Sequence, residues 1–383
     1  MGQRVGIVGV GQTHHRSRRK DVNGIELINE AVQRALEETG LTRDDIDAVV
    51  IGNMDHFEGI NYVDMWSVEG AGAIMKPIMK VTTGGTTGSS VAISAYHHVA
   101  SGLFDVVLAI GWEKNSESDT TGGIITCSDP IWDRDYYAGA IPSLAVEASA
   151  YMKAYGVTEK DAARVSVRDR KNALRNPFAH LRREVTVEEV LSSPMLSYPI
   201  KLLDICPRTD GAAAVVFASE SVAPKLTRQP AWVNATSVSH SYTYFGDIDY
   251  TSISSLEIAS KDAYQQAGIT DPFRQIDVIE LYQPYSFAGL KWIEALGLCE
   301  PGEAPQLVWD GVTDLEGELP INPSGGVLST NCIGATALLR VGEAALQIMG
   351  KAGERQVDAK VAVATGFGGC YWSDVMILGK EPR

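Results

Sequence analysis

ALEETGLTRDDIDAVVIG (residues 35–52) and AYQQAGITDPFRQIDVIEL (residues 263–281) repeat one pattern in the two halves of the chain. Each copy reads as the end of a helix, a glycine that can cap it, a short loop and an apolar strand. An amphipathic helix precedes each copy, IELINEAVQRAL in the first and SLEIASKDAY in the second. Self-similarity over such a distance indicates repeated architecture, so the pattern predicts two related halves.

Both copies continue with the same order of elements. TTGGTTGSS (82–90) opens a helix that is followed by the strand DVVLAIG (105–111), and NPSGGVLSTNCIGAT (322–336) opens a helix that is followed by the strand KVAVATG (360–366). Strands this apolar are usually covered on both faces, so two α/β halves sharing a central helical layer are expected. We place the N-terminal half at residues 1–114 and 210–240, a mainly helical inserted loop domain at 115–209, and the C-terminal half at 241–383.

Composition excludes several classes of protein. The formal net charge of −15 argues against nucleic-acid binding, because phosphates need a basic surface. The five cysteines are scattered without CxxC spacing, which argues against a disulfide framework or a metal site and fits a reducing cytoplasm. No apolar run approaches the roughly 20 residues that span a bilayer, and the start shows no signal peptide. We therefore expect a cytoplasmic protein with no membrane segment and no metal of its own.

Five motifs, taken in order, resemble the thiolase superfamily, specifically its sterol-carrier-type branch. They are DPIWDR (129–134), RKNALRNPFAHLR (170–182), CPRTDGAAAVVFAS (206–219), EALGLCEPGE (294–303) and NPSGG (322–326). The resemblance implies the α/β five-layered αβαβα thiolase fold, a homodimer core, and coenzyme A as part of the substrate with no other cofactor. The N-terminal GIVGVG has GxxGxG spacing and no acidic ribose partner, so we interpret it as a structural strand and not as a dinucleotide site.

The resemblance also locates four catalytic positions, and none carries the usual residue. The nucleophilic cysteine falls on Gly85, which offers no atom to acylate. The histidine of the GHP motif falls on Asn331, which can donate a hydrogen bond but cannot act as a base. The C-terminal cysteine falls on Gly366. The HDCF motif of the sterol-carrier branch falls on Tyr282-Gln283-Pro284-Tyr285, so its cysteine base is absent as well.

Other side chains in the same loops are candidates for a rebuilt site. Tyr282 and Tyr285 can perform acid–base work or simply line the pocket as aromatics. Cys332 and Cys370 are either a relocated nucleophile or small buried hydrophobes. His56 follows the second strand, a region that in thiolases runs along the dimer interface, and is otherwise a surface-loop residue.

Two further groups of residues have predicted binding roles. The resemblance implies backbone N–H donors for an oxyanion at Gly84, Gly85 and Gly368, together with Asn331. A basic stretch in the inserted domain is either a solvated helix face or part of the coenzyme A site. The residues predicted to bind coenzyme A are Arg164, Arg168, Arg175, Arg182, Ser324 and Gly325.

Three functions stay open at this point. The favoured one is retro-aldol cleavage of a bulky β-hydroxyacyl-CoA, because it needs no acyl-enzyme; relatives of this kind act with a small zinc-ribbon and OB-fold partner protein. The second is thiolysis of a bulky aromatic β-ketoacyl-CoA of the benzoylsuccinyl-CoA type, through a displaced Cys332 or Cys370 or by direct attack of coenzyme A. The third is a non-catalytic acyl-CoA-binding subunit.

Overall fold

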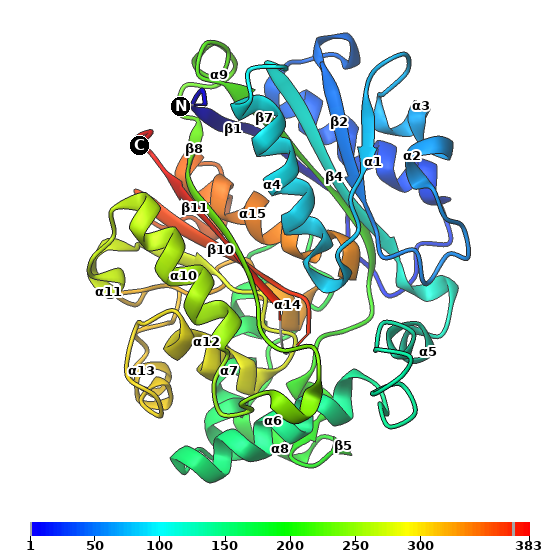
Figure 1. The fold of residues 1–383 in the computed structure, drawn as a ribbon. Coiled ribbons are helices and arrows are strands. Elements are labelled where there is room, and N and C mark those ends of the chain that lie inside the picture. Colours follow the sequence, from blue (N-terminus) through cyan, green and yellow to red (C-terminus); the bar gives the residue numbers. More distant parts are fainter. Residues whose placement is uncertain (1, 370–371) are drawn as a thin grey trace.

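The computed structural model describes residues 2–369 and 372–383, apart from the side chain of Phe245, so the predicted site residue Cys370 lies outside the described residues. Nine strands form one continuous sheet in the order β3-β2-β4-β7-β1-β8-β11-β10-β9 (Figure 1). Their bounds are β1 Val5–Gln12, β2 Ala48–Gly52, β3 Ile78–Lys80, β4 Val106–Lys114, β7 Asp210–Ser219, β8 Ala231–His240, β9 Val278–Glu280, β10 Val361–Phe367 and β11 Trp372–Gly379.

The duplication appears as one pairing scheme used twice. β2 pairs with β4 in parallel and β4 with β7 antiparallel; β9 pairs with β10 in parallel and β10 with β11 antiparallel. A parallel bridge between Ile279 and Ile321 stands in the second half where β2 pairs with β3 in the first. Two residue pairs of β1 and β8, Gly6–Trp232 and Ile7–Ala231, join the half-sheets.

The two halves of the sheet enclose a central helical layer, as the sequence predicts. Helices α4 (Thr87–Ala100) and α15 (Ile333–Met349) pack against each other and contact strands of both halves (Figure 1). Every residue of α15 is buried. Helices α1 (Gly24–Thr39) and α10 (Ser254–Ala267) cover the outer faces, which completes the α/β layering.

Local sequence signals explain how the outer helices are placed. Asn23 caps α1 in a capping box with Glu26, and Gly40 ends the helix in the left-handed conformation. Gly11 of the GIVGVG segment lies so close to α1 that a Cβ atom there would be 2.1 Å from the Ala31 carbonyl oxygen. The glycine therefore allows strand β1 to pack closely on α1.

The inserted segment is mainly helical and packs on the C-terminal half. It contains α5 (Thr120–Ile125), α6 (Ala140–Tyr155), α7 (Glu159–Ala173), α8 (Val187–Ser192) and the short hairpin β5 (Met195–Ser197) and β6 (Ile200–Lys201). Helices α6 and α7 contact α12 (Ser286–Ala295), and α7 also contacts α13 (Ala304–Trp309) and α14 (Gly326–Ser329). The remaining α-helices are short: α2 Val63–Trp66, α3 Val68–Ala71, α9 Ala223–Leu226 and α11 Pro272–Gln275.

One predicted boundary is wrong. The sequence places residues 210–240 in the N-terminal half, but β8 pairs with β11 from Trp232 to His240 and meets β1 at only two residue pairs. The strand therefore belongs to the C-terminal half, and the boundary lies between β7 and β8. Within the described residues, no helix combines the length and apolar character needed to cross a membrane.

Candidate active site

The glycine-rich turn before α4 leaves no room for a side chain at the nucleophile position. A 3-10 turn over Gly84–Thr86 leads into α4, and the Thr87 hydroxyl donates to the Gly84 carbonyl at 2.7 Å. A Cβ atom on Gly85 would lie 2.3 Å from the carbonyl oxygen of Phe367, at the end of β10. The space that a cysteine would need at position 85 is therefore occupied by backbone.

The backbone N–H groups predicted to bind an oxyanion differ in whether they are already hydrogen-bonded within the protein. The N–H of Gly368 donates to the Trp372 carbonyl at 2.9 Å, so the prediction that it binds an oxyanion is wrong for this arrangement. Among the described residues, no acceptor is found for the N–H groups of Gly84 and Gly85. These two groups lie at the N-terminal end of α4, where the helix dipole favours negative charge.

Asn331 belongs to a short chain of hydrogen bonds near Tyr282. The Thr336 hydroxyl, which also acts on the Tyr282 hydroxyl, donates to Asn331 Oδ1 at 2.9 Å. Asn331 Nδ2 in turn donates to Cys206 Sγ at 3.1 Å. Burial raises the pKa of Tyr282, so its hydroxyl stays protonated. The chain fixes the orientation of the Asn331 amide.

Tyr285 lies in a different network. Its hydroxyl donates to Glu147 Oε2 at 3.0 Å, and Lys291 Nζ binds the same oxygen at 2.9 Å. All three side chains are buried, and Lys291 also donates to the Tyr250 carbonyl at 2.8 Å. Tyr285 therefore connects α6 to α12, and the structure does not bring its hydroxyl into the chain that holds Asn331.

Cys332 is not placed as an activated nucleophile. Its side chain is fully buried, and its Sγ lies 3.4 Å from His15 Nδ1. Burial raises the pKa of the Cys332 thiol well above its usual range and lowers the pKa of His15 to about 3. A neutral thiol beside a neutral imidazole corresponds to the small-hydrophobe interpretation. His56 is exposed in the loop after β2.

A buried carboxyl lies beside the second empty cysteine position. Asp374 on β11 is 1% exposed and accepts a hydrogen bond from the hydroxyl of Ser89, in the first turn of α4. A Cβ atom on Gly366 would lie 2.4 Å from Ser89 Oγ and 3.0 Å from Asp374 Oδ2. Burial raises the pKa of Asp374 to about 7. The sequence alone did not single out Asp374, because its position beside Gly366 depends on the register of β10 and β11.

Sequence reasoning also missed the polar residues around Asn331. His180 Nδ1 lies 3.0 Å from the Thr209 hydroxyl, and the Thr209 N–H donates to the Asn331 carbonyl at 3.2 Å. Burial raises the pKa of the half-buried Cys206 thiol to about 11. His180 and Cys206 both lie in motifs that carried the family resemblance, which was the one available signal. In the part of the chain that is described, no group of His, Cys, Asp and Glu side chains is arranged to hold a metal ion.

The residues predicted to bind coenzyme A do not converge. Arg164 pairs with Asp314 at 2.6 Å, the buried Arg168 with Asp169 at 2.9 Å, and Arg175 with Glu316 at 2.8 Å. Ser324 is buried, and its hydroxyl is bonded to Glu280 and Arg340. Gly325 is also buried, against Ala173. Arg168, Ser324 and Gly325 are therefore structural in this arrangement.

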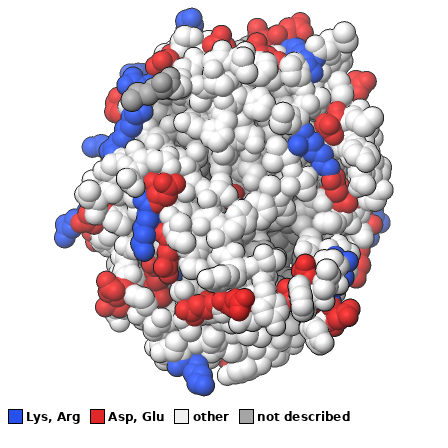
Figure 2. Space-filling model, in the orientation of Figure 1, with Lys and Arg blue, Asp and Glu red and all other residues white. Residues whose placement is uncertain are grey.

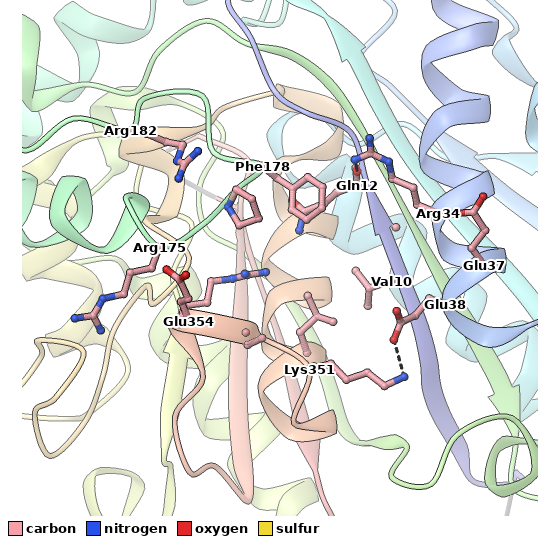
Figure 3. Close-up of a pocket in the computed structure, with 16 residues that line it drawn as sticks. Val10, Gln12, Arg34, Glu37, Glu38, Arg175, Phe178, Arg182, Lys351 and Glu354 are labelled. Carbon is pink, nitrogen blue, oxygen red and sulfur yellow. Dashed lines mark hydrogen bonds and ion pairs between the residues drawn. The ribbon is translucent and has the colours of Figure 1, made fainter.

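Arg175 and Arg182 line a surface groove of about 620 Å³ between β1, α1 and the segment after α15 (Figure 3). Arg34 lies over the Phe178 ring, 5.3 Å from its centroid, and Lys351 pairs with Glu38 at 2.6 Å. Arg182 donates to the Leu174 carbonyl at 3.0 Å. On the face drawn in Figure 2, charged side chains gather toward the edges and the hollowed middle is largely uncharged.

Comparisons with known proteins agree with this geometry. Residues 5–221 match the family model of the thiolase N-terminal domain, and residues 236–380 match that of the thiolase C-terminal domain-like family. The chain is 34% identical over 372 residues to an acetyl-CoA acetyltransferase of Methanothermobacter thermautotrophicus, an alignment that covers 95% of this chain and 96% of the relative. It is 28% identical over 377 residues to the benzoylsuccinyl-CoA thiolase subunit BbsB of Thauera aromatica, covering 96% of each.

A third relative and one solved structure complete the comparison. Sterol carrier protein 2 of Bos taurus is 30% identical over 397 residues, covering 95% of this chain and 70% of that protein. The solved structure titled Ltp2-ChsH2(DUF35) aldolase superposes with a TM-score of 0.85 at 27% identity, covering 99% of this chain and 98% of that one. The chain therefore belongs to the thiolase superfamily, in its sterol-carrier-protein-2-like branch, whose members act on acyl-CoA thioesters.

Proposed function

We propose that the protein cleaves the Cα–Cβ bond of a β-hydroxyacyl-CoA by a retro-aldol reaction that forms no acyl-enzyme. The observation that carries the proposal is the overlap between a side chain at position 85 and the Phe367 carbonyl oxygen. The acyl-enzyme of ordinary thiolases forms on a nucleophile at the N-terminal end of α4, and this position can hold neither a cysteine nor another side chain without backbone movement. Similarity to a solved aldolase supports the same reaction class.

The chemistry requires one group that accepts and returns a proton. Asp374 suits this role because a general base works best with a pKa near the operating pH, and burial raises its pKa to about 7. The carboxylate takes the proton of the β-hydroxyl through the Ser89 hydroxyl, and the Cβ–O bond becomes a carbonyl. The electrons of the Cα–Cβ bond move into the thioester, which becomes an enolate, and the same proton then returns to Cα.

The enolate oxygen needs fixed donors at the place where its charge develops. The N–H groups of Gly84 and Gly85 and the second hydrogen of the Asn331 amide supply them in this proposal. Thr336 acts indirectly, because its hydroxyl donates to Asn331 Oδ1 and thereby aims the amide nitrogen, and Tyr282 acts through its contact with Thr336. The reaction releases a carbonyl compound and a shortened acyl-CoA, with no net proton uptake.

Thiolysis of a bulky β-ketoacyl-CoA is the second candidate. It is favoured by the names of two relatives, an acetyl-CoA acetyltransferase and a benzoylsuccinyl-CoA thiolase subunit. Because Cys332 is fully buried beside His15, thiolysis on the described residues would proceed by direct attack of coenzyme A on the substrate.

The proposed assembly has two parts. The first is a homodimer through the free edge of β3, where Ile74, Met75 and Met79 are exposed. The second is a complex with a small zinc-ribbon and OB-fold protein, suggested by the two-component name of the aldolase and by the subunit name of BbsB. Co-expression with such a protein, followed by size-exclusion chromatography with light scattering, tests both parts.

Product analysis tests the proposed reaction. The purified protein, with any co-purifying partner, is incubated with β-hydroxyacyl-CoA esters of increasing bulk, and products are identified by liquid chromatography and mass spectrometry. The proposal predicts a free aldehyde or ketone and a shortened acyl-CoA in equal amounts. Conversion of β-ketoacyl-CoA alone, with β-hydroxy esters left intact, would overturn it in favour of thiolysis.

A further inference from the structure

The loop after β2, residues 53–59, contacts both elements that carry the proposed oxyanion donors. The Thr82 hydroxyl, at the start of the glycine-rich turn, donates to the Asn53 carbonyl at 3.1 Å. Phe57 is 2% exposed and packs in one apolar cluster with Ile333, the first residue of α15. The loop therefore joins the glycine-rich turn to the N-terminal end of α15.

Two glutamates fasten this loop to β4 and α15. Glu113 of β4 is fully buried, and its Oε2 accepts from the N–H of Met54, in the loop, at 3.0 Å and from the N–H of Gly334, in α15, at 2.9 Å. In return, Oε1 of Glu58, in the loop, accepts from the N–H of Lys114, in β4, at 2.7 Å. Each glutamate thus binds the backbone of the segment that carries the other, and the two carboxyl groups act directly on each other.

The remaining oxygen of Glu113 has no donor. Its Oε1 is enclosed and receives no hydrogen bond from any residue that the structure describes. A carboxylate only accepts hydrogen bonds, so two ionised carboxylates repel each other in a buried site, whereas one proton between them makes a donor and an acceptor. A single shared proton is therefore the arrangement that satisfies the buried oxygen.

In the part of the chain that is described, no cation neutralises the two glutamates. Lys114 is the adjacent basic residue, and its Nζ donates to the Val22 carbonyl at 2.9 Å and pairs with Glu117 at 2.7 Å. The other titratable groups on the neighbouring segments are paired with each other, exposed, or uncharged thiols; they are Asp55 with Lys80, His56 and Arg134, and Cys127 and Cys332.

We propose that Glu58 and Glu113 share one proton and act as a positioning pair, which holds the glycine-rich turn and the N-terminal end of α15 at the spacing that the enolate oxygen requires. Loss of the shared proton places two negative charges side by side in a buried site, and the loop then detaches from β4. The inference rests on the proposed function for the effect on the enolate. The shared proton and the opening of the loop are properties of the folded chain alone.

The direction of the pH effect follows from burial. Burial raises the pKa of both carboxyls, and the charge of Glu58 raises the pKa of Glu113 further. The folded protein therefore binds the shared proton more tightly than the unfolded chain does, in which a glutamate has a pKa of about 4.3. The stability that the proton contributes is complete below that pH and is lost as pH rises through the raised value. The loop should thus be closed in acid and open on the alkaline side.

Hydrogen exchange followed by mass spectrometry tests the positioning pair on the complete chain, without substrate. The N–H of Met54, which donates to Glu113, is the direct reporter. After correction for the intrinsic pH dependence of exchange, protection of residues 53–59 should be constant in acid and then fall by up to about tenfold per pH unit once the shared proton is lost. The buried interior of α15 should stay protected throughout.

Amide substitutions separate the shared proton from the rest of the loop. In Glu58→Gln and in Glu113→Gln, the side-chain amide donates to the remaining carboxylate without a titrating proton, so protection of the loop should no longer depend on pH. Glu69→Gln, at an exposed carboxylate in α3, is the matched control and should keep the wild-type pH dependence. Wild-type protection that does not change between about pH 5 and pH 9 would overturn the inference, as would a pH dependence that survives in both amide variants.

The rate of cleavage gives a second readout, which a merely structural role would not move in this way. Ionisation of Asp374 should give a rising limb in the pH profile of kcat, and opening of the loop a falling limb at higher pH; Glu58→Gln should remove only the falling limb and leave KM unchanged. Loop opening as described, combined with no cleavage of β-hydroxyacyl-CoA, would remove the retro-aldol proposal and keep the positioning pair. Cleavage without any pH-dependent change in protection of the loop would keep the reaction and remove the pair.

Discussion

Restoring a cysteine at position 85 should fail to produce a thiolase. In Gly85→Cys, the new Cβ would lie 2.3 Å from the Phe367 carbonyl oxygen, whereas ordinary van der Waals contacts begin near 3.4 Å. The backbone of β10 or of the glycine-rich turn must therefore move by about 1 Å, and inserting a side chain into a packed region typically costs about 1–3 kcal/mol. We expect the variant to be destabilised by that amount.

Chemical denaturation and intact-mass analysis measure the two consequences. Gly122→Cys is a suitable control, because its Cβ would meet only the end of the Asp119 side chain in a partly exposed helix. We expect Gly85→Cys to show a lower denaturation midpoint than the control and no acyl adduct after incubation with β-ketoacyl-CoA. A Gly85→Cys protein of wild-type stability that gains an acyl group on the introduced thiol would refute the reasoning.

Three other perturbations follow from buried polar groups. Tyr285→Phe should lower the free energy of unfolding in urea by about 1–3 kcal/mol and leave kcat unchanged. Tyr282→Phe should instead lower kcat about tenfold, because Asn331 is held less firmly. An equal loss of kcat in both variants would contradict the different roles given to the two tyrosines. Lys291→Met removes the cation that pairs with the buried carboxylate of Glu147, the partner of Tyr285, and should lower the free energy of unfolding by about 3–5 kcal/mol. An unchanged denaturation midpoint would disprove this prediction. Because the pKa of Asp374 is raised, the folded state binds the carboxyl proton more tightly, and the stability that this proton contributes falls as pH rises from about 4 to 7. Asp374→Asn should therefore be more stable than the wild type by up to about 4 kcal/mol at pH 8 and equally stable below pH 4. A stability difference that does not change with pH would contradict this prediction.

The fold could be predicted from sequence because each level of the pattern agreed. The repeated helix–glycine–strand segments are local signals, and the structure pairs their strands identically in both halves. The boundary at β8 could not be predicted, because an apolar strand fits either half-sheet and only its hydrogen-bonding partner decides. β8 follows β11 along most of its length, a contact between residues far apart in the chain.

The site was predictable only where the family motif fixed a position. Gly85 and Asn331 lie just before the N-terminal ends of α4 and α15, Tyr282 follows β9, and their roles stay predictions. The sequence could not distinguish Tyr282 from Tyr285, because the direction of each hydroxyl depends on packing against other elements.

In the proposed reaction, the carbon–carbon bond breaks without acyl transfer to the protein or to coenzyme A. The most direct test is the number of coenzyme A molecules consumed for each bond broken, measured with a thiol reagent while the products are quantified. Retro-aldol cleavage predicts zero consumption of coenzyme A and a cleavage rate that is independent of added coenzyme A. One coenzyme A consumed for each bond broken, with a rate that rises with its concentration, would contradict it.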